Sequence, residues 1–236
     1  NCIIDEKGSG VQTTHFSMLR GKTIVVDASI YMYKFKQDGV FAELFYNFVS
    51  TMKYYGVTLI FVFDGKPPVS KQSTISERRA FRNTSEVQYN SIVDKLHNAK
   101  RELNEDMGKP NTSSLMVRTM KQNIKQFEKQ VISLRKSAVS LDANDFMTAK
   151  KILDVMGIYH VTPEHEADPL CVTFVTSGIA FACMSEDTDM FVYGCTRIIR
   201  SINVFTRKCI MYTTGSILKN LGIPHETFRA ITFMSG

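Results

Sequence analysis

Three carboxylates crowd into four positions of the segment "SEDTD", which contains Glu186, Asp187 and Asp189. Just before it runs "GIAFAC", an apolar stretch that predicts a buried strand. Like charges at this spacing repel one another, so a neutralising partner is expected nearby. The segment therefore suggests a cation site at the end of a strand, although a turn or a helix cap would use the same residues.

More carboxylates occupy equivalent positions elsewhere in the chain. Asp27 ends the apolar run "TIVVD", Asp64 ends "FVFD", and Glu164 and Glu166 open a helix predicted after a third short strand. In parallel α/β sheets, ligands bind outside the carboxyl ends of the strands. Each acid alone could bond a loop amide or favour the positive end of a helix. Together they predict a site for a hard divalent cation, Mg²⁺ or Mn²⁺.

The elements that must position these acids alternate along the chain. Residues 21–29 and 57–68 predict strands that end at Asp27 and Asp64, and residues 41–56 between them have helical spacing. Further on, helices are expected at 142–157 and 163–178, with short strands at 158–161, 179–183, 197–202 and 208–213. Strands that are apolar throughout indicate a buried, mostly parallel sheet flanked by helices, an α/β fold.

The excess positive charge lies in one central segment. Residues 69–150 hold fifteen Lys and Arg against nine Asp and Glu, whereas the rest of the chain holds fourteen of each. The segment is polar and has helical spacing, which indicates a helical insertion between strands. Such a surplus suggests a polyanionic partner, nucleic acid first. A solvated helical face would have the same composition.

Composition excludes several other classes of protein. No apolar run approaches the roughly 20 residues of a membrane span, so no membrane partner is expected. The five cysteines include no C-x-x-C pair, which argues against zinc and a disulfide framework and favours a reducing, intracellular compartment.

The sequence resembles the flap endonuclease family of 5′ nucleases in four motifs, which occur in the family's order. They are "TIVVDASIYMYKF", "FVFDGKPP", "PEHEADPLC" and "SEDTDMFVYG". The resemblance implies a single nuclease domain over 1–236, with a PIN-like core and an inserted basic helical arch at about 80–140. It also implies two Mg²⁺ ions, replaceable by Mn²⁺, on Asp27, Asp64, Glu164, Glu166, Asp187 and Asp189.

The same resemblance implies roles for several basic and aromatic residues. Lys71 and Arg78 match a catalytic pair that reaches the scissile phosphate. They are seven positions apart, which is about two turns of a helix, so both would lie on the same side of it. Tyr33 matches an aromatic that stacks on a nucleotide, although either Tyr31 or Tyr33 could pack in the core instead. The remaining expected substrate contacts are Arg79, Arg82, Arg135 and Lys136.

The resemblance implies a Mg²⁺-dependent nuclease that cuts DNA carrying a 5′ flap or branch, in replication, repair or recombination. An endoribonuclease on the same fold and a non-catalytic junction-binding module are the alternatives. The duplex-binding region of the family would lie beyond residue 236, as would any contact with a sliding clamp. The expected compartment is the nucleus, with a viral or organellar origin as the alternative. Pro169 is a departure from the family pattern, because members of the family continue a helix at this position. A proline is tolerated there only in the first turn of a helix.

Overall fold

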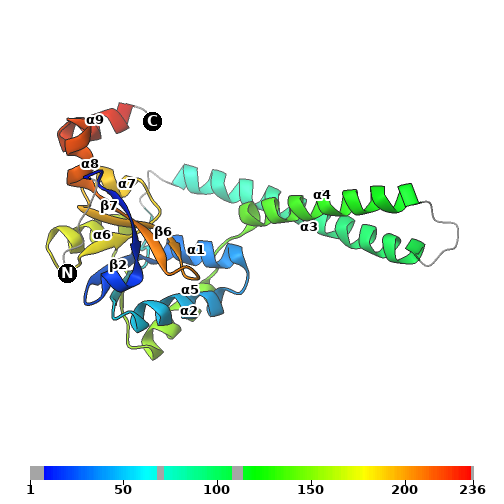
Figure 1. The fold of residues 1–236 in the computed structure, drawn as a ribbon, viewed down its shortest axis with the longest axis horizontal. Helices are drawn as coiled ribbons and strands as arrows, with labels where there is room; N and C mark the ends of the chain where they lie inside the picture. Colours follow the sequence, from blue (N-terminus) through cyan, green and yellow to red (C-terminus); the bar gives the residue numbers. More distant parts are fainter. Residues whose placement is uncertain (1–7, 68–71, 108–113, 235–236) are drawn as a thin grey trace. The chain divides into compact units, whose positions relative to one another are not determined.

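A computed structural model of the chain describes residues 8–67, 72–107 and 114–234, which divide into two compact units. One unit combines the two ends of the chain around a β-sheet, and the other is the inserted segment 69–140, a helical hairpin (Figure 1). None of the helices in the described ranges is both long and apolar enough to cross a bilayer.

The first unit is built on a sheet of seven strands in the order β1-β7-β6-β5-β2-β3-β4. Neighbouring strands from β6 to β4 run parallel, while β7 pairs antiparallel with both β6 and β1. The predicted mostly parallel α/β sheet is therefore confirmed. The strands are β1 (Val11–His15), β2 (Thr23–Asp27), β3 (Thr58–Val62), β4 (Tyr159–Val161), β5 (Ala182–Met184), β6 (Arg197–Asn203) and β7 (Lys208–Thr213).

Both faces of the sheet are covered, because alternate strand residues point to opposite sides. Ile24 and Val26 of β2 pack with α1, α2 and α5, whereas Val25 packs with α6 and α7. Burial on both faces explains why these strands are apolar throughout. The helices of this unit are η1 (Phe16–Leu19), α1 (Ala28–Asp38), α2 (Phe41–Tyr54), α5 (Ala143–Val155), α6 (Ala167–Thr176), α7 (Asp189–Val192), α8 (Thr214–Leu221) and α9 (His225–Met234).

An aromatic cluster fixes α1 and α2 on the sheet. Tyr31 of α1 stacks on Phe48 of α2 with ring centroids 5.8 Å apart, and Phe48 meets Phe61 of β3 at 6.4 Å. All three side chains are buried. Burying one such side chain contributes roughly 1.5–3 kcal/mol. The cluster therefore holds α1 firmly beside the ends of β2 and β3.

The predicted start of the helix at 163–178 is wrong, because α6 begins only at Ala167. Gly65 N donates to the carbonyl oxygen of His165 at 2.7 Å, and Lys66 N donates to that of Glu164 at 2.9 Å. These bonds hold 164–165 in a bend ahead of α6 instead of a helical turn. Pro169 consequently occupies the first turn of α6, where it blocks no helical hydrogen bond.

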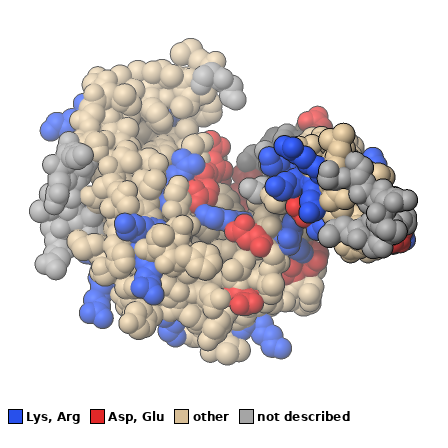
Figure 2. Space-filling view, turned by 45° about the vertical axis from the view of Figure 1, so that its right-hand side comes forward, with Lys and Arg blue, Asp and Glu red and all other residues tan. Residues whose placement is uncertain are grey.

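The second unit consists of two helices, α3 (Gln72–Met107) and α4 (Ser114–Ala138). They pack along each other, with Ile124 of α4 buried and an ion pair of 2.8 Å between Lys100 Nζ and Glu128 Oε1. Figure 2 shows Lys and Arg side chains gathered on the hairpin surface that faces the viewer. By sequence, α3 carries six Lys and Arg and six Asp and Glu, whereas α4 carries six Lys and Arg against one Glu. The charge surplus found in the sequence therefore lies largely on α4.

Candidate metal centre

Six carboxylates follow four strands that are neighbours in the sheet. Asp27 is the last residue of β2, and Asp64 lies two residues beyond β3. Glu164 and Glu166 follow β4, and Asp187 and Asp189 follow β5. Because β5, β2, β3 and β4 are adjacent and parallel, their carboxyl ends lie at one edge of the sheet. The fold thus delivers all six acids to the same edge.

Asp27 lies deepest of the six, with 3% of its surface exposed. Its Oδ1 accepts a hydrogen bond from Ile30 N at 3.4 Å, which caps α1, and its Oδ2 accepts one from Ser185 Oγ at 3.1 Å. Burial, together with the negative charges of Asp64 and Asp168, raises the pKa of Asp27 to about 7. No Lys, Arg or His among the described residues forms an ion pair with Asp27, and a buried carboxylate of this kind is one that a divalent cation would neutralise.

Asp64 joins the end of β3 to the start of α6. Its Oδ1 accepts a hydrogen bond from Ala167 N at 3.0 Å, one residue beyond Glu166. The adjacent Gly65 lies against the 163–165 backbone so closely that a Cβ there would meet Pro163 O at 2.1 Å. This close approach explains the glycine of "DGKPP" and brings Asp64 beside the Glu164 and Glu166 segment.

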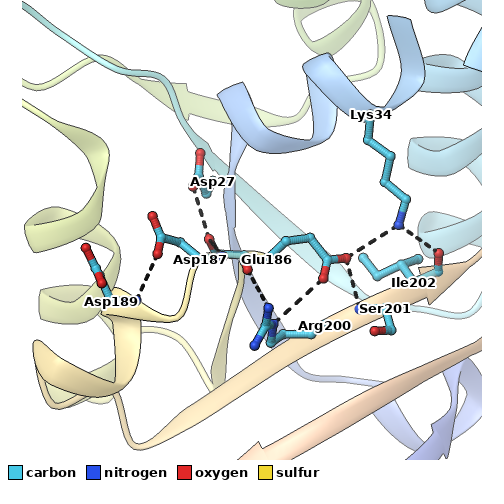
Figure 3. A network of polar contacts seen from close by, with 9 residues as sticks. Asp27, Lys34, Glu186, Asp187, Asp189, Arg200, Ser201 and Ile202 are labelled. Carbon is cyan, nitrogen blue, oxygen red and sulfur yellow. Dashed lines mark hydrogen bonds and ion pairs between the residues drawn. The ribbon is translucent and has the colours of Figure 1, made fainter. Parts of the chain in front are cut away.

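Ser185 connects Asp27 to the segment that carries Asp187 and Asp189. Its side chain is wholly buried, and its Oγ accepts a hydrogen bond from Asp187 N at 3.1 Å while donating to Asp27. Asp189 N in turn donates to Asp187 Oδ1 at 2.8 Å, as Figure 3 shows. Sequence reasoning missed Ser185, and its only signal was a hydroxyl between a buried strand and a carboxylate pair.

Glu186, the third acid of the crowded segment, points away from the other two (Figure 3). Its carboxylate contacts Lys34 Nζ at 3.4 Å and Arg200 Nε at 3.8 Å. Two cations therefore neutralise it, while Asp187 and Asp189 remain directed toward the other side of the segment. Sequence reasoning missed both basic partners, because they lie on α1 and β6, far from Glu186 along the chain.

The donor set fits Mg²⁺ or Mn²⁺ by its chemistry, since it consists of carboxylate oxygens. Asp187 and Glu166 are half-buried, and Asp64, Glu164 and Asp189 are exposed at the sheet edge. Among the described residues, however, no three His, Cys, Asp or Glu side chains converge closely enough to form a ready-made metal cage. The structure thus gathers the acids at one edge without closing them around a point.

The structure distinguishes the two tyrosines that the sequence left open. Tyr31 is fully buried and stacked in the aromatic core. Tyr33 is half-buried, so part of its ring is accessible. It lies on α1, whose N-cap is Asp27. Tyr33 is therefore the one of the pair with surface to offer a ligand.

The predicted basic contacts belong to the other unit or lie outside the description. Lys71 is outside the described residues, and the side chains of Arg78 and Lys136 are not described. Arg79 and Arg135 are exposed and Arg82 is half-buried, on α3 and α4. The six acids are thus gathered by the fold of the first unit, and these basic residues belong to the hairpin.

Comparison with known proteins matches both ends of the chain to one family. The XPG N-terminal domain matches residues 1–85, and the XPG I-region matches residues 157–236. Flap endonuclease 1-B of Xenopus laevis is 26% identical over 253 aligned positions, covering 99% of this chain and 58% of that protein. The chain thus spans somewhat more than half the length of this relative.

Solved structures share the fold. The catalytic core of Rad2 in complex with DNA substrate has a TM-score of 0.62 at 20% identity, covering 95% of this chain and 58% of that one. The Holliday junction-resolving enzyme GEN1, in complex with product DNA, Mg²⁺ and Mn²⁺, has a TM-score of 0.55 at 16% identity. That match covers 98% of this chain and 45% of GEN1.

Proposed function

This chain belongs to the XPG family of 5′ nucleases, and from that premise we propose that it cuts flapped or branched DNA with the help of divalent cations. It is a structure-specific nuclease, a hydrolase of phosphodiester bonds.

One observation carries the proposal: four neighbouring parallel strands end in six carboxylates at a single sheet edge, with buried Asp27 between Asp64 and the Ser185 hydroxyl. Acids concentrated in this way repel one another and favour cations of charge +2. When bound, a pair of such ions would activate a water molecule and stabilise the leaving oxygen of the phosphodiester.

The chain's own residues have distinct roles in this proposal. Asp27, Asp64, Glu164, Glu166, Asp187 and Asp189 hold the cations, and Asp27 must release the proton that burial favours before it can do so. Ser185 keeps Asp27 and the Asp187 segment in register through its two hydrogen bonds. The half-buried Tyr33 stacks on a nucleobase, an interaction that contributes roughly 1–3 kcal/mol and does not depend on the base sequence.

The hairpin supplies the positive charge that a DNA strand requires. Lys71 and Arg78 are proposed to contact the scissile phosphate, and Arg79, Arg82, Arg135 and Lys136 to contact the neighbouring backbone. Phosphate contacts of this kind are sequence-independent and weaken with salt. The length of α3 and α4, and the surplus of Lys and Arg on α4, support this role.

The proposed substrate and cations follow those present in the solved structures of similar proteins. The structure of Rad2 contains a DNA substrate, and that of GEN1, a Holliday junction-resolving enzyme, contains product DNA with Mg²⁺ and Mn²⁺. Branched DNA and Mg²⁺ are therefore the first substrate and cation to test. A DNA substrate in turn points to the nucleus or another DNA-containing compartment.

Cleavage of a labelled 5′-flap DNA by the full 236-residue chain tests the proposal. Cutting is expected in Mg²⁺, and it should stop in EDTA and in Asp187→Ala, whose fold is checked by circular dichroism. A single-stranded RNA run alongside identifies an endoribonuclease if it is cut faster. Binding of the flap without cleavage in Mg²⁺, or cleavage in EDTA, would contradict the proposed activity.

A further inference from the structure

We propose that Glu186, Lys34 and Arg200 form a positioning network that holds the acidic segment, residues 185–189, in the geometry needed to bind cations. The inference rests on the proposed function, and it assigns to Glu186 a role different from that of the acids beside it. It also explains why three carboxylates occupy four consecutive positions: two face the cation site and one anchors the segment.

The side chain of Glu186 is fully engaged away from the cation site. Its Oε1 accepts hydrogen bonds from Ser201 N at 2.9 Å and from Lys34 Nζ at 3.4 Å. Its Oε2 lies 3.8 Å from Arg200 Nε. The side chain is 27% exposed, so these contacts are only partly screened by solvent. A carboxylate held by two cations and a backbone amide has little to offer a further cation.

The network also holds the backbone of the acidic segment. Arg200 Nη2 donates to the carbonyl oxygen of Glu186 at 2.7 Å, while the guanidinium lies over the ring of Tyr212 with 6.0 Å between Cζ and the centroid. Lys34 Nζ also donates to Ile202 O at 3.3 Å. The contacts therefore join three elements that are distant in sequence: α1, the acidic segment and β6 (Figure 3).

The backbone of β6 is shaped to receive Glu186. The pairing of β6 with β7 shifts register between Arg200 and Asn203, and within this bulge Ser201 has a φ of 53°. The left-handed region is disfavoured for a residue with a side chain, at a cost of order 1–3 kcal/mol. In this conformation the Ser201 amide donates to the carboxylate of Glu186. A bulge that aims a backbone donor at one side chain is typical of a functional site.

Two adjacent residues, Ser185 and Glu186, therefore hold the acidic segment in two different directions. Ser185 ties it to Asp27 within the cation site, and Glu186 ties it to α1 and β6 outside that site. Asp187 follows directly and has little freedom to move. Because Lys34 follows Tyr33 on α1, the same network fixes the helix that carries the proposed stacking ring. Partners that orient ligands typically affect metal affinity 10–100-fold.

Titration with Mg²⁺ measures this role without cleavage. The rise in thermal midpoint of the full chain is recorded against Mg²⁺ concentration for the wild type, Glu186→Gln and Lys34→Gln. The controls are Glu226→Gln on α9 and Lys151→Gln on α5, both exposed changes of the same type. The network variants are expected to require about tenfold more Mg²⁺ than the wild type for the same rise in thermal midpoint. The two controls should require the same Mg²⁺ concentration as the wild type.

The double variant and the reversed pair give the result its specificity. Lys34→Gln with Glu186→Gln should require less additional Mg²⁺ than the two single effects combined would give, because the Lys34–Glu186 contact is broken by either change and can be lost only once. Lys34→Glu combined with Glu186→Lys should recover part of the affinity. If Glu186→Gln requires a Mg²⁺ concentration within twofold of that for the wild type, the proposal is overturned. Complete loss of the Mg²⁺ effect in Glu186→Gln with Lys34→Gln normal also overturns it, because Glu186 would then be a ligand.

Hydrogen–deuterium exchange separates this proposal from the proposed function. In Mg²⁺-free buffer, peptides covering residues 185–194 should exchange faster in Glu186→Gln and Lys34→Gln than in the wild type and the two controls. Unchanged exchange in both network variants overturns the positioning role. Faster exchange in a protein whose wild type neither binds Mg²⁺ nor cuts DNA would support the network and contradict the proposed activity.

Discussion

The hydroxyl of Ser185 donates a hydrogen bond to Oδ2 of Asp27 at 3.1 Å, linking the residue after β5 to the last residue of β2. Oγ of Ser185 also accepts a hydrogen bond from the backbone amide of Asp187. One wholly buried side chain thus sets the distance between two of the proposed cation ligands.

Ser185→Ala should weaken Mg²⁺ binding and cleavage together. The change removes one bond to Asp27 and leaves the half-buried amide of Asp187 without its acceptor, which costs about 1–3 kcal/mol in stability. We expect the Mg²⁺ requirement for flap cleavage to rise about tenfold. Ser177→Ala, an exposed hydroxyl at the end of α6, is the control. Wild-type Mg²⁺ dependence in Ser185→Ala would contradict the assignment.

Gly65→Ala should damage the fold and the site at once. A Cβ at this position would lie 2.1 Å from Pro163 O and 2.6 Å from His165 O, so the two backbone segments must separate. Overpacking of this kind costs about 1–3 kcal/mol, measured as a lower free energy of unfolding in denaturant. Gly215→Ala on α8, where a Cβ meets nothing within 4 Å, should be neutral or slightly stabilising. Equal effects of the two changes would disprove the close-contact argument.

The Mg²⁺ effect on stability should grow with pH. Burial raises the pKa of Asp27 to about 7 from an ordinary value of 3.8, so the folded state keeps this proton over a range where the unfolded state has lost it. Without Mg²⁺, this group therefore makes the protein less stable as pH rises from about 4 to about 7. Mg²⁺ must displace the proton at pH 6 but not at pH 8.

Thermal unfolding with and without Mg²⁺ at pH 6 and pH 8 tests this linkage. The midpoint shift caused by Mg²⁺ is expected to be larger at pH 8 in the wild type. Asp27→Asn cannot titrate, so the difference between wild type and variant isolates Asp27 from other groups. A Mg²⁺ shift that is identical at both pH values in the wild type would exclude Asp27 as a ligand that must deprotonate.

Tyr33→Ala should weaken substrate binding and leave the fold intact. Its ring is half-buried, and loss of stacking on a base costs roughly 1–3 kcal/mol. We expect the KM for a flap DNA to rise about 5- to 150-fold, with the thermal midpoint little changed. Tyr33→Phe retains the ring and should behave like the wild type. Normal KM in Tyr33→Ala would remove this residue from the substrate contacts.

Tyr31→Phe tests the opposite role of the neighbouring tyrosine. The Tyr31 hydroxyl is buried and has no hydrogen-bond partner among the described residues. Removing a buried, unsatisfied hydroxyl while keeping the ring should leave the free energy of unfolding unchanged or raise it by about 1 kcal/mol. Flap cleavage should be unaffected. A clear loss of stability in denaturant unfolding would show that the hydroxyl has a partner in solution.

The sequence alone determined the elements whose signal is local. The apolar runs within 21–29 and 57–68 predicted buried strands, and the spacing of 41–56 predicted a helix, since burial on one or two faces leaves a short-range pattern. The structure places these elements at 23–27, 58–62 and 41–54. The positions of the six acids at strand ends also followed from the sequence. The charge surplus between residues 69 and 150 marked the segment that forms the hairpin helices.

Only the tertiary structure decided how these pieces meet. The order of strands places β2 between β5 and β3, and β1 pairs with β7 almost 200 residues away, a relationship that no local pattern encodes. The burial that raises the pKa of Asp27, the two bonds of Ser185 and the turning away of Glu186 toward Lys34 and Arg200 all depend on side chains brought together from distant segments. Periodicity identifies which face of an element is buried, but direction and distance between side chains arise only when the elements pack.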